Sequence, residues 1–133
     1  LHGVTAHDVL RQLKFLNKDQ TLRQAIYGQG KNATRIIVNF SAAEARVTSE
    51  IGGDVLLPPW GFIIEGPRFA AFHALRWNKE EYSNGALFTL QPKDDKNLKN
   101  SRRIRVFHAF GPENIRWKDN FYKIKREQVI QTQ

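Results

Sequence analysis

The sequence predicts an all-β protein, an antiparallel β-sandwich of about eight to ten short strands preceded by a short N-terminal helix or connector. Three observations predict this fold. Short runs rich in β-branched and aromatic residues alternate with clusters of Gly, Pro, Asn and Asp, about every 8–12 residues. The 133 residues, 41% of them hydrophobic, suit one domain with one packed core. No apolar run approaches the roughly 20 residues that a membrane-spanning helix needs.

The first segment, residues 1–20, is predicted to be a helix or connector outside the sandwich. Four apolar residues recur at the spacings of three and four that are typical of an amphipathic helix: Val9, Leu10, Leu13 and Leu16. Thr5 followed by Asp8 resembles a capping box at the start of a helix over residues 5–16. A helix of about three turns is marginal alone, so we expect it to need a surface to pack against.

The sandwich itself is predicted to span residues 21–126. Ten runs have the composition of strands, at residues 21–27, 34–40, 45–49, 55–57, 60–65, 69–77, 86–90, 103–110, 115–117 and 121–124. Prolines lie between these runs or at their starts, where a missing N–H does not interrupt a strand ladder. The polar tail, residues 127–133, is expected to fray.

The composition bounds the class of protein. There is no cysteine, which excludes disulfides and thiolate zinc sites. The net charge is +8, and the excess lies after residue 66, where 14 Lys and Arg face 7 Asp and Glu. The chain begins at Leu1 and contains no methionine, which leads us to expect a fragment of a longer protein.

No combination of residues predicts an enzyme active site, a metal site or a cofactor. Nucleophile-elbow, P-loop and dinucleotide-binding motifs do not occur. His2 and His7 lie near the start, whereas His73 and His108 alternate with apolar residues. The latter two are a candidate metal pair or general base, or else core histidines that hydrogen-bond to neighbours, which we favour. Among the acidic residues only Glu65, at the end of a predicted strand, is a candidate for burial.

Two binding alternatives remain open from the sequence. Basic residues gather near the C-terminal end and, with interleaved aromatics, are a candidate nucleic-acid surface: Arg102, Arg103, Arg105, Lys118, Lys123 and Lys125. Four aromatic residues are candidates for stacking on sugar rings: Trp60, Trp77, Tyr82 and Trp117. We favour a solvated strand face for the first set and packing for the second, so nucleic acid is not an expected partner.

Four segments resemble one known family. They are FLNKD at residues 15–19, LRQAIYGQG at 22–30, IIVNFS at 36–41 and LPPWGF at 57–62. Together they resemble the C-terminal β-sandwich accessory domains of large bacterial glycoside hydrolases, in which a strand ending in VNFS leads to LPPYGF. Here Trp60 stands where that family has tyrosine. The match covers about residues 15–66, and the remainder of the chain fits less sharply.

The resemblance implies a non-catalytic domain whose enzymatic carboxylates lie in an upstream catalytic domain of the same polypeptide. That domain is the expected partner, with carbohydrate as a further candidate and no membrane. The resemblance also favours a secreted or periplasmic location and implies that residues 5–16 connect the two domains. Within the sandwich we expect Val38 and Phe40 to face the core and Asn39 to hydrogen-bond at its rim.

Overall fold

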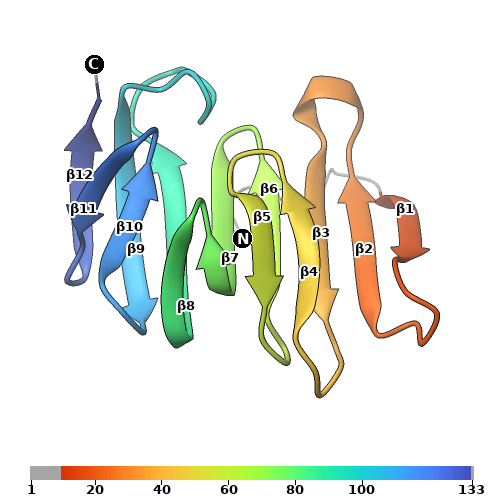
Figure 1. Ribbon diagram of the computed structural model, residues 1–133. Coiled ribbons are helices and arrows are strands. Elements are labelled where there is room, and N and C mark those ends of the chain that lie inside the picture. Colours follow the sequence, from red (N-terminus) through yellow and green to blue (C-terminus); the bar gives the residue numbers. More distant parts are fainter. Residues whose placement is uncertain (1–9, 133) are drawn as a thin grey trace.

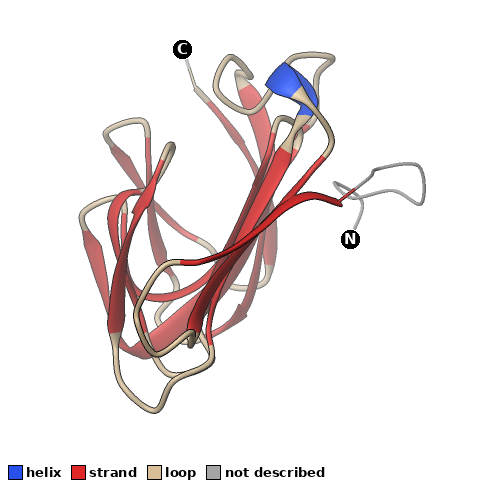
Figure 2. Cartoon of the chain, turned by 90° about the vertical axis from the view of Figure 1, so that its right-hand side faces the viewer, coloured by secondary structure: helices blue, strands red, loops and turns tan. Residues whose placement is uncertain are grey.

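The computed structural model describes residues 10–132, and these residues are nearly all β (Figures 1 and 2). Within them lie one 3₁₀ turn, η1 (Gly30–Asn32), and twelve strands in place of the eight to ten predicted. The strands are β1 (Leu10–Phe15), β2 (Leu22–Tyr27), β3 (Thr34–Asn39), β4 (Ala45–Ser49), β5 (Gly53–Leu57), β6 (Phe62–Gly66), β7 (Phe69–Trp77), β8 (Glu80–Pro92), β9 (Arg103–Phe110), β10 (Asn114–Trp117), β11 (Asn120–Lys123) and β12 (Glu127–Gln131). The predicted all-β, antiparallel, sandwich-like fold is confirmed.

The strands form two layers. The main layer runs in the order β1-β2-β3-β6-β7-β8-β9-β12, with antiparallel neighbours throughout. The β4–β5 hairpin belongs to the same sheet through β7 but folds over one face of the main layer. The separate β10–β11 hairpin lies on that same side (Figure 1). These two hairpins form the second layer, which Figure 2 shows edge-on beside the main layer.

The core lies between the two layers. A row of paired side chains crosses the main layer on its inner side: Ile37, Ile63, Phe72 and Phe88, each at most 1% exposed. From the second layer Val55, Leu57 and Ile115 pack against them, and each is fully buried. Because side chains alternate along a strand, every inward residue in this row places its neighbours on the other face of the layer.

An irregularity in the β7–β8 pairing lies where β7 passes from one layer to the other. The pairing of β7 with β8 shifts register between Ala74 and Arg76, and Arg76 then pairs with Leu56 of β5. Irregularities of this kind bend a strand at the corner of a sandwich. Trp77 lies beyond this point in the core, where its ring stacks on Phe72 at 4.3 Å. A Cβ at Gly52 would overlap the Trp77 indole, so only glycine fits there.

The predicted N-terminal helix is wrong for its described part. Residues 10–15 form the edge strand β1, which pairs with β2 through partners such as Leu13 and Ala25. The ladder to β2 satisfies backbone groups of β1. Thr5, Asp8 and the histidines at positions 2 and 7 lie outside the described residues.

The predicted frayed tail is also wrong over most of its length. Residues 127–131 form the edge strand β12, which pairs with β9 along its whole length. Ile130 turns inward and is only 3% exposed, and the Thr132 N–H donates to the Arg102 carbonyl at 2.7 Å. An edge strand needs only one buried side chain in two, so a polar composition did not exclude it.

Candidate functional site

The strand register determines which residues of the main layer point away from the second layer. Ile37 and Asn39 point inward and are each 1% exposed, so Ile36, Val38 and Phe40 lie on the opposite face. The expectation that Val38 and Phe40 face the core is therefore wrong. Both faces of β3 are apolar, and periodicity alone does not say which of them is covered.

That opposite face is apolar, and no strand within residues 10–132 packs on it. We call it the open face. Large hydrophobic side chains remain exposed along it: Leu13 (62%), Phe15 (43%), Phe40 (39%), Trp60 (64%), Phe107 (41%), Phe110 (46%) and Val129 (41%). In the middle of the face Ile64, Phe69 and Ala71 are only 5–7% exposed and form a small buried cluster, beside the partly buried Ile36, Val38 and Phe62. A continuous apolar surface of this kind is typical of a protein-protein contact rather than of a solvated face.

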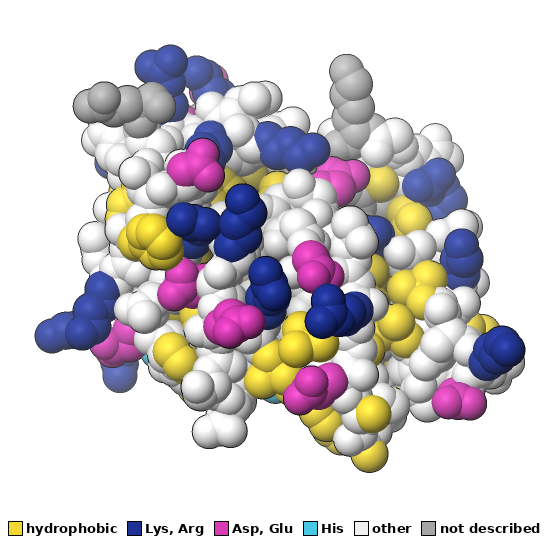
Figure 3. Space-filling view, in the orientation of Figure 1, with side chains coloured by type: hydrophobic (Ala, Val, Ile, Leu, Met, Phe, Trp, Pro, Cys, Tyr) yellow, Lys and Arg dark blue, Asp and Glu magenta, His cyan; other side chains and the backbone are white. Residues whose placement is uncertain are grey.

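The other side of the molecule, where the second layer faces the viewer, is different. Lys and Arg side chains are interspersed there with Asp and Glu (Figure 3). Two examples are the exposed ion pairs Arg46–Asp54 and Lys99–Glu50, each 3.2 Å long. Mixed charges of this kind keep a surface solvated, so the open face is the candidate functional site.

One part of the open face combines aromatic rings with a cation. We call Phe15, Arg23, Phe40 and Trp60 the Trp60 corner. The Trp60 ring meets Phe40 edge-on, with centroids 5.6 Å apart and planes at 87°. The Arg23 guanidinium carbon lies 4.8 Å from the Phe40 centroid and 5.6 Å from that of Phe15. The corner therefore offers both an apolar surface and a positive charge.

Buried hydrogen bonds hold Trp60 in this exposed position. The backbone N–H of Trp60 donates to the Asn39 carbonyl at 2.7 Å. The side-chain amide of the buried Asn39 donates in turn to the Pro58 carbonyl at 3.0 Å. The Gly61 N–H closes the turn on the same Pro58 carbonyl, at 2.8 Å. Trp60 itself has φ +64°, a left-handed conformation that is unfavourable for a bulky side chain. A strained backbone that presents an exposed tryptophan is a recognised indication of function.

His73 lies near the middle of the open face, as its alternation with apolar residues predicted. Its ring meets Phe62 at 6.2 Å and Phe110 at 5.1 Å, both edge-on. Partial burial lowers the pKa of His73, and a hydrogen bond to the Trp60 backbone opposes this shift. The neutral form of the ring suits an apolar contact surface.

The predicted sugar-stacking set does not form a platform. Trp77, Tyr82 and Trp117 are 2%, 1% and 2% exposed, so burial contradicts sugar stacking by these three and agrees with the packing role that we favoured; of the four only Trp60 is exposed to a ligand. Beyond the irregularity in the β7–β8 pairing, Trp77 lies in the core, where it stacks parallel to Trp117 at 6.3 Å. The sugar interpretation needed rings that share one exposed plane, and Trp60 stands perpendicular to its neighbour Phe40.

The predicted basic set is distributed over both layers. Arg103 and Arg105 lie on β9 of the main layer, whereas Lys118 and Lys123 belong to the β10–β11 hairpin. Two of its members are paired with acids: Arg105 with Glu127 at 3.0 Å and Lys123 with Glu113 at 3.9 Å. This arrangement differs from the single stripe that a nucleic-acid backbone requires.

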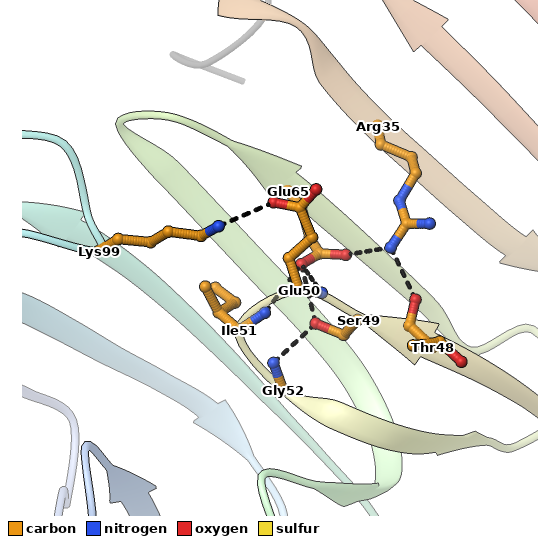
Figure 4. A network of polar contacts seen from close by, with 8 residues as sticks. All are labelled: Arg35, Thr48, Ser49, Glu50, Ile51, Gly52, Glu65 and Lys99. Atoms are coloured by element: carbon orange, nitrogen blue, oxygen red, sulfur yellow. Dashed lines mark hydrogen bonds and ion pairs between the residues drawn. The ribbon is translucent and has the colours of Figure 1, made fainter. Parts of the chain in front are cut away.

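Glu65, the carboxylate that the sequence singled out as a candidate for burial, is partly buried with 11% of its side chain exposed, and its contacts join the two layers (Figure 4). One oxygen accepts a bond from Arg35 at 2.7 Å, and the other accepts from the Ser49 hydroxyl at 2.8 Å and the Glu50 N–H at 3.0 Å. Arg35 also donates to the Thr48 carbonyl at 2.7 Å. Residues of β3 and β6 are thus fixed to the β4–β5 turn. With both oxygens engaged, Glu65 is suited to structural support.

A pocket of about 490 Å³ opens beside this network. Arg11, Arg35 and Lys99 line it together with Glu50 and Glu65. Glu50 pairs with Lys99 and Glu65 with Arg35, so opposite charges in the walls already compensate one another. Apolar side chains such as Ile26, Ile51 and Leu98 also line the pocket, and the Arg35–Glu65 pair in its wall helps to hold the layers together.

The remaining candidates are placed as follows. His108 is 9% exposed, packs against Phe88 at 4.8 Å between ring centroids and approaches the Lys125 carbonyl at 3.3 Å, so it is a core histidine. Within residues 10–132 no group of three or more His, Asp or Glu side chains is placed to hold a metal ion. None of the helices in this part of the chain is long and apolar enough to span a membrane.

Comparison of the chain with models of protein families, with curated proteins and with solved structures found no match. The open face is therefore the feature on which a function can be proposed. Sequence reasoning had missed Phe15, Arg23 and Phe40 as members of the site. A run of consecutive apolar residues at 36–38 could have indicated this face. A strand that is apolar on both sides is usually covered on both sides.

Proposed function

We propose that this chain is a non-catalytic accessory domain of a carbohydrate-active enzyme, a glycoside hydrolase, and that it packs against a catalytic domain absent from this chain and stabilises it. The single observation that carries the proposal is the open face. Both sides of the main layer are apolar, but within residues 10–132 strands pack on only one of them. The sequence resemblance over residues 15–66 supplies the class of enzyme.

The size of the exposed surface supports stable packing rather than a passing encounter. Seven large hydrophobic side chains on the open face are each 39–64% exposed. Complete burial of one such side chain contributes roughly 1.5–3 kcal/mol, and half-exposed ones contribute less. A domain joined by a linker forms this contact within one molecule, which reduces the entropic cost of association.

The proposal is tested on the complete polypeptide that contains residues 1–133. Hydroxyl-radical footprinting would compare this polypeptide with the isolated chain and follow oxidation of Phe15, Trp60 and Phe107. We expect these residues to be oxidised freely in the isolated chain and to be protected in the complete polypeptide. Equal oxidation in both would refute the docking role, and an absence of glycosidase activity in the complete polypeptide would refute the class of enzyme.

A second candidate is binding of carbohydrate through Trp60, favoured by its 64% exposure on a strained turn. A polysaccharide pull-down and a glycan array with the isolated chain test it, with Trp60→Ala as the informative variant. Binding that is lost in this variant would make the domain a targeting module. Single-stranded DNA at low and high salt serves as the parallel arm, since contacts to phosphates weaken steeply with salt.

A further inference from the structure

The Trp60 corner carries a charge that nothing in residues 10–132 neutralises. Arg23 pairs with Phe15 of β1 and Val38 of β3 across the sheet, which places it on the open face. Its Nε–H donates to the Gln20 carbonyl at 3.1 Å. Within the described part of the chain, no carboxylate lies within ion-pair distance of Arg23. The fork of terminal N–H groups therefore remains available to a partner.

The other end of the open face provides the comparison. Arg105 lies on β9 and pairs with Glu127 of β12 at 3.0 Å, so this cation already has its carboxylate. A partner that covers Arg105 meets the Arg105–Glu127 ion pair, which has no net charge. Covering Arg23 takes an unpaired guanidinium out of water, which is strongly unfavourable unless the partner supplies an opposite charge.

The rings around Arg23 orient it for one kind of contact. A planar guanidinium that stacks on an aromatic face keeps its edge free for two parallel hydrogen bonds to one carboxylate. Phe40 provides such a face at 4.8 Å from the guanidinium carbon. Trp60, Phe15 and Phe40 then exclude water from the contact, which strengthens the ion pair.

We propose that the surface that covers the open face presents an Asp or Glu carboxylate to Arg23, within an apolar patch that contacts Phe15, Phe40 and Trp60. This inference rests on the proposed docking function and adds the chemistry of the partner. The pairing fixes the orientation in which the domain docks, because a polar contact within an apolar interface specifies register.

The test uses the complete polypeptide with Arg23→Glu, Arg23→Gln and Arg23→Lys. The matched control is Arg46→Gln, which removes an exposed arginine from β4 in the second layer. Oxidation of Trp60 and Phe40 is measured by footprinting, and the thermal stability of each isolated variant shows that its fold is retained.

We expect Arg23→Glu to raise oxidation of the corner to the level of the isolated chain. Arg23→Gln shifts the docking equilibrium roughly tenfold or more, because the partner carboxylate is left buried and unpaired. The protection measured for Arg23→Lys should lie between that of Arg23→Gln and that of the wild type, because lysine keeps the charge but lacks the planar fork of arginine. Arg46→Gln leaves protection unchanged. Replacing the partner carboxylate with Arg restores protection to Arg23→Glu.

The outcomes separate this inference from the docking function. One outcome is that the open face is protected in the wild-type complete polypeptide and that all Arg23 variants behave like Arg46→Gln. This would refute the pairing of Arg23 with a partner carboxylate and leave the docking function supported. If the wild-type face is unprotected, the docking function itself is refuted. If protection appears in the isolated chain as its concentration rises, a second copy covers the face and both proposals are overturned.

Discussion

The two faces of the main layer have similar composition and different surroundings. On the inner face Phe72 and Phe88 are fully buried by the second layer. On the open face Phe107 and Phe110 retain 41% and 46% of their exposure. The difference indicates that the inner face stabilises the fold, and it is the basis of our proposal that the open face meets a partner. Substitutions on the two faces should therefore affect different properties.

The largest expected effect is on the inner face. Phe72→Ala removes a ring that stacks on Trp77 and Phe88, and the cavity should cost about 3–5 kcal/mol of unfolding free energy. Phe107→Ala on the open face should cost less than about 1 kcal/mol in the isolated chain. Urea denaturation of both variants measures the difference. Equal losses would show that the open face is already packed.

The next effect concerns the connection between the layers. Glu65→Gln weakens the charge-assisted bonds from Arg35 and Ser49 and should cost about 2 kcal/mol. The matched control, Glu50→Gln, loses only the exposed pair with Lys99 and should change stability by less than about 0.5 kcal/mol. Thermal unfolding of both variants checks this order, which would be contradicted by a larger loss in the control.

A smaller effect follows from His73 on the open face. Burial lowers the pKa of folded His73, so the unfolded chain binds a proton at a higher pH than the folded one. Stability should therefore decline as pH falls below the unfolded value of about 6.5, and level off below the folded pKa. NMR titration of the ring measures the shift, and His73→Gln should remove this part of the pH dependence. A folded pKa at or above 6.5 would contradict the prediction.

The smallest effect on stability is expected at Trp60. Trp60→Gly relieves the left-handed backbone at φ +64° but loses contact with Phe40, so stability should stay within about 1 kcal/mol of wild type. The same variant should lose nearly all acrylamide quenching of fluorescence, because Trp77 and Trp117 are each 2% exposed. Persistent quenching would mean that one of the buried pair is accessible.

Much of the fold was predictable because strands and turns are encoded locally. Runs at residues 45–49, 69–77 and 103–110 match β4, β7 and β9 to the residue, and the turn predicted around residues 78–80 holds Asn78 and Lys79 with positive φ. The N-terminal segment failed because its spacing also fits a helix, and only the partner strand β2 decides between the two.

Most of the candidate site could not be predicted, because it depends on which side of each strand is covered. Alternation in β3 places Ile37 and Asn39 on one face and Val38 and Phe40 on the other. It does not indicate which of the two faces is covered by the second layer. The β7–β8 pairing shifts between Ala74 and Arg76, with the extra residues in β8, and alternation along β7 alone did not show that Trp77 lies in the core.

Local composition was sufficient to predict the all-β class, most of the strands and turns, and Glu65 as a carboxylate to check for burial. The packing of distant strands was needed to show that β1 and β12 are edge strands, that Trp60 is the exposed tryptophan, and that Arg23 lies beside aromatic rings with no ion-pair partner within residues 10–132. The physical reason is that propensity acts along the chain, whereas exposure and charge compensation depend on strands that are distant in sequence and adjacent in space.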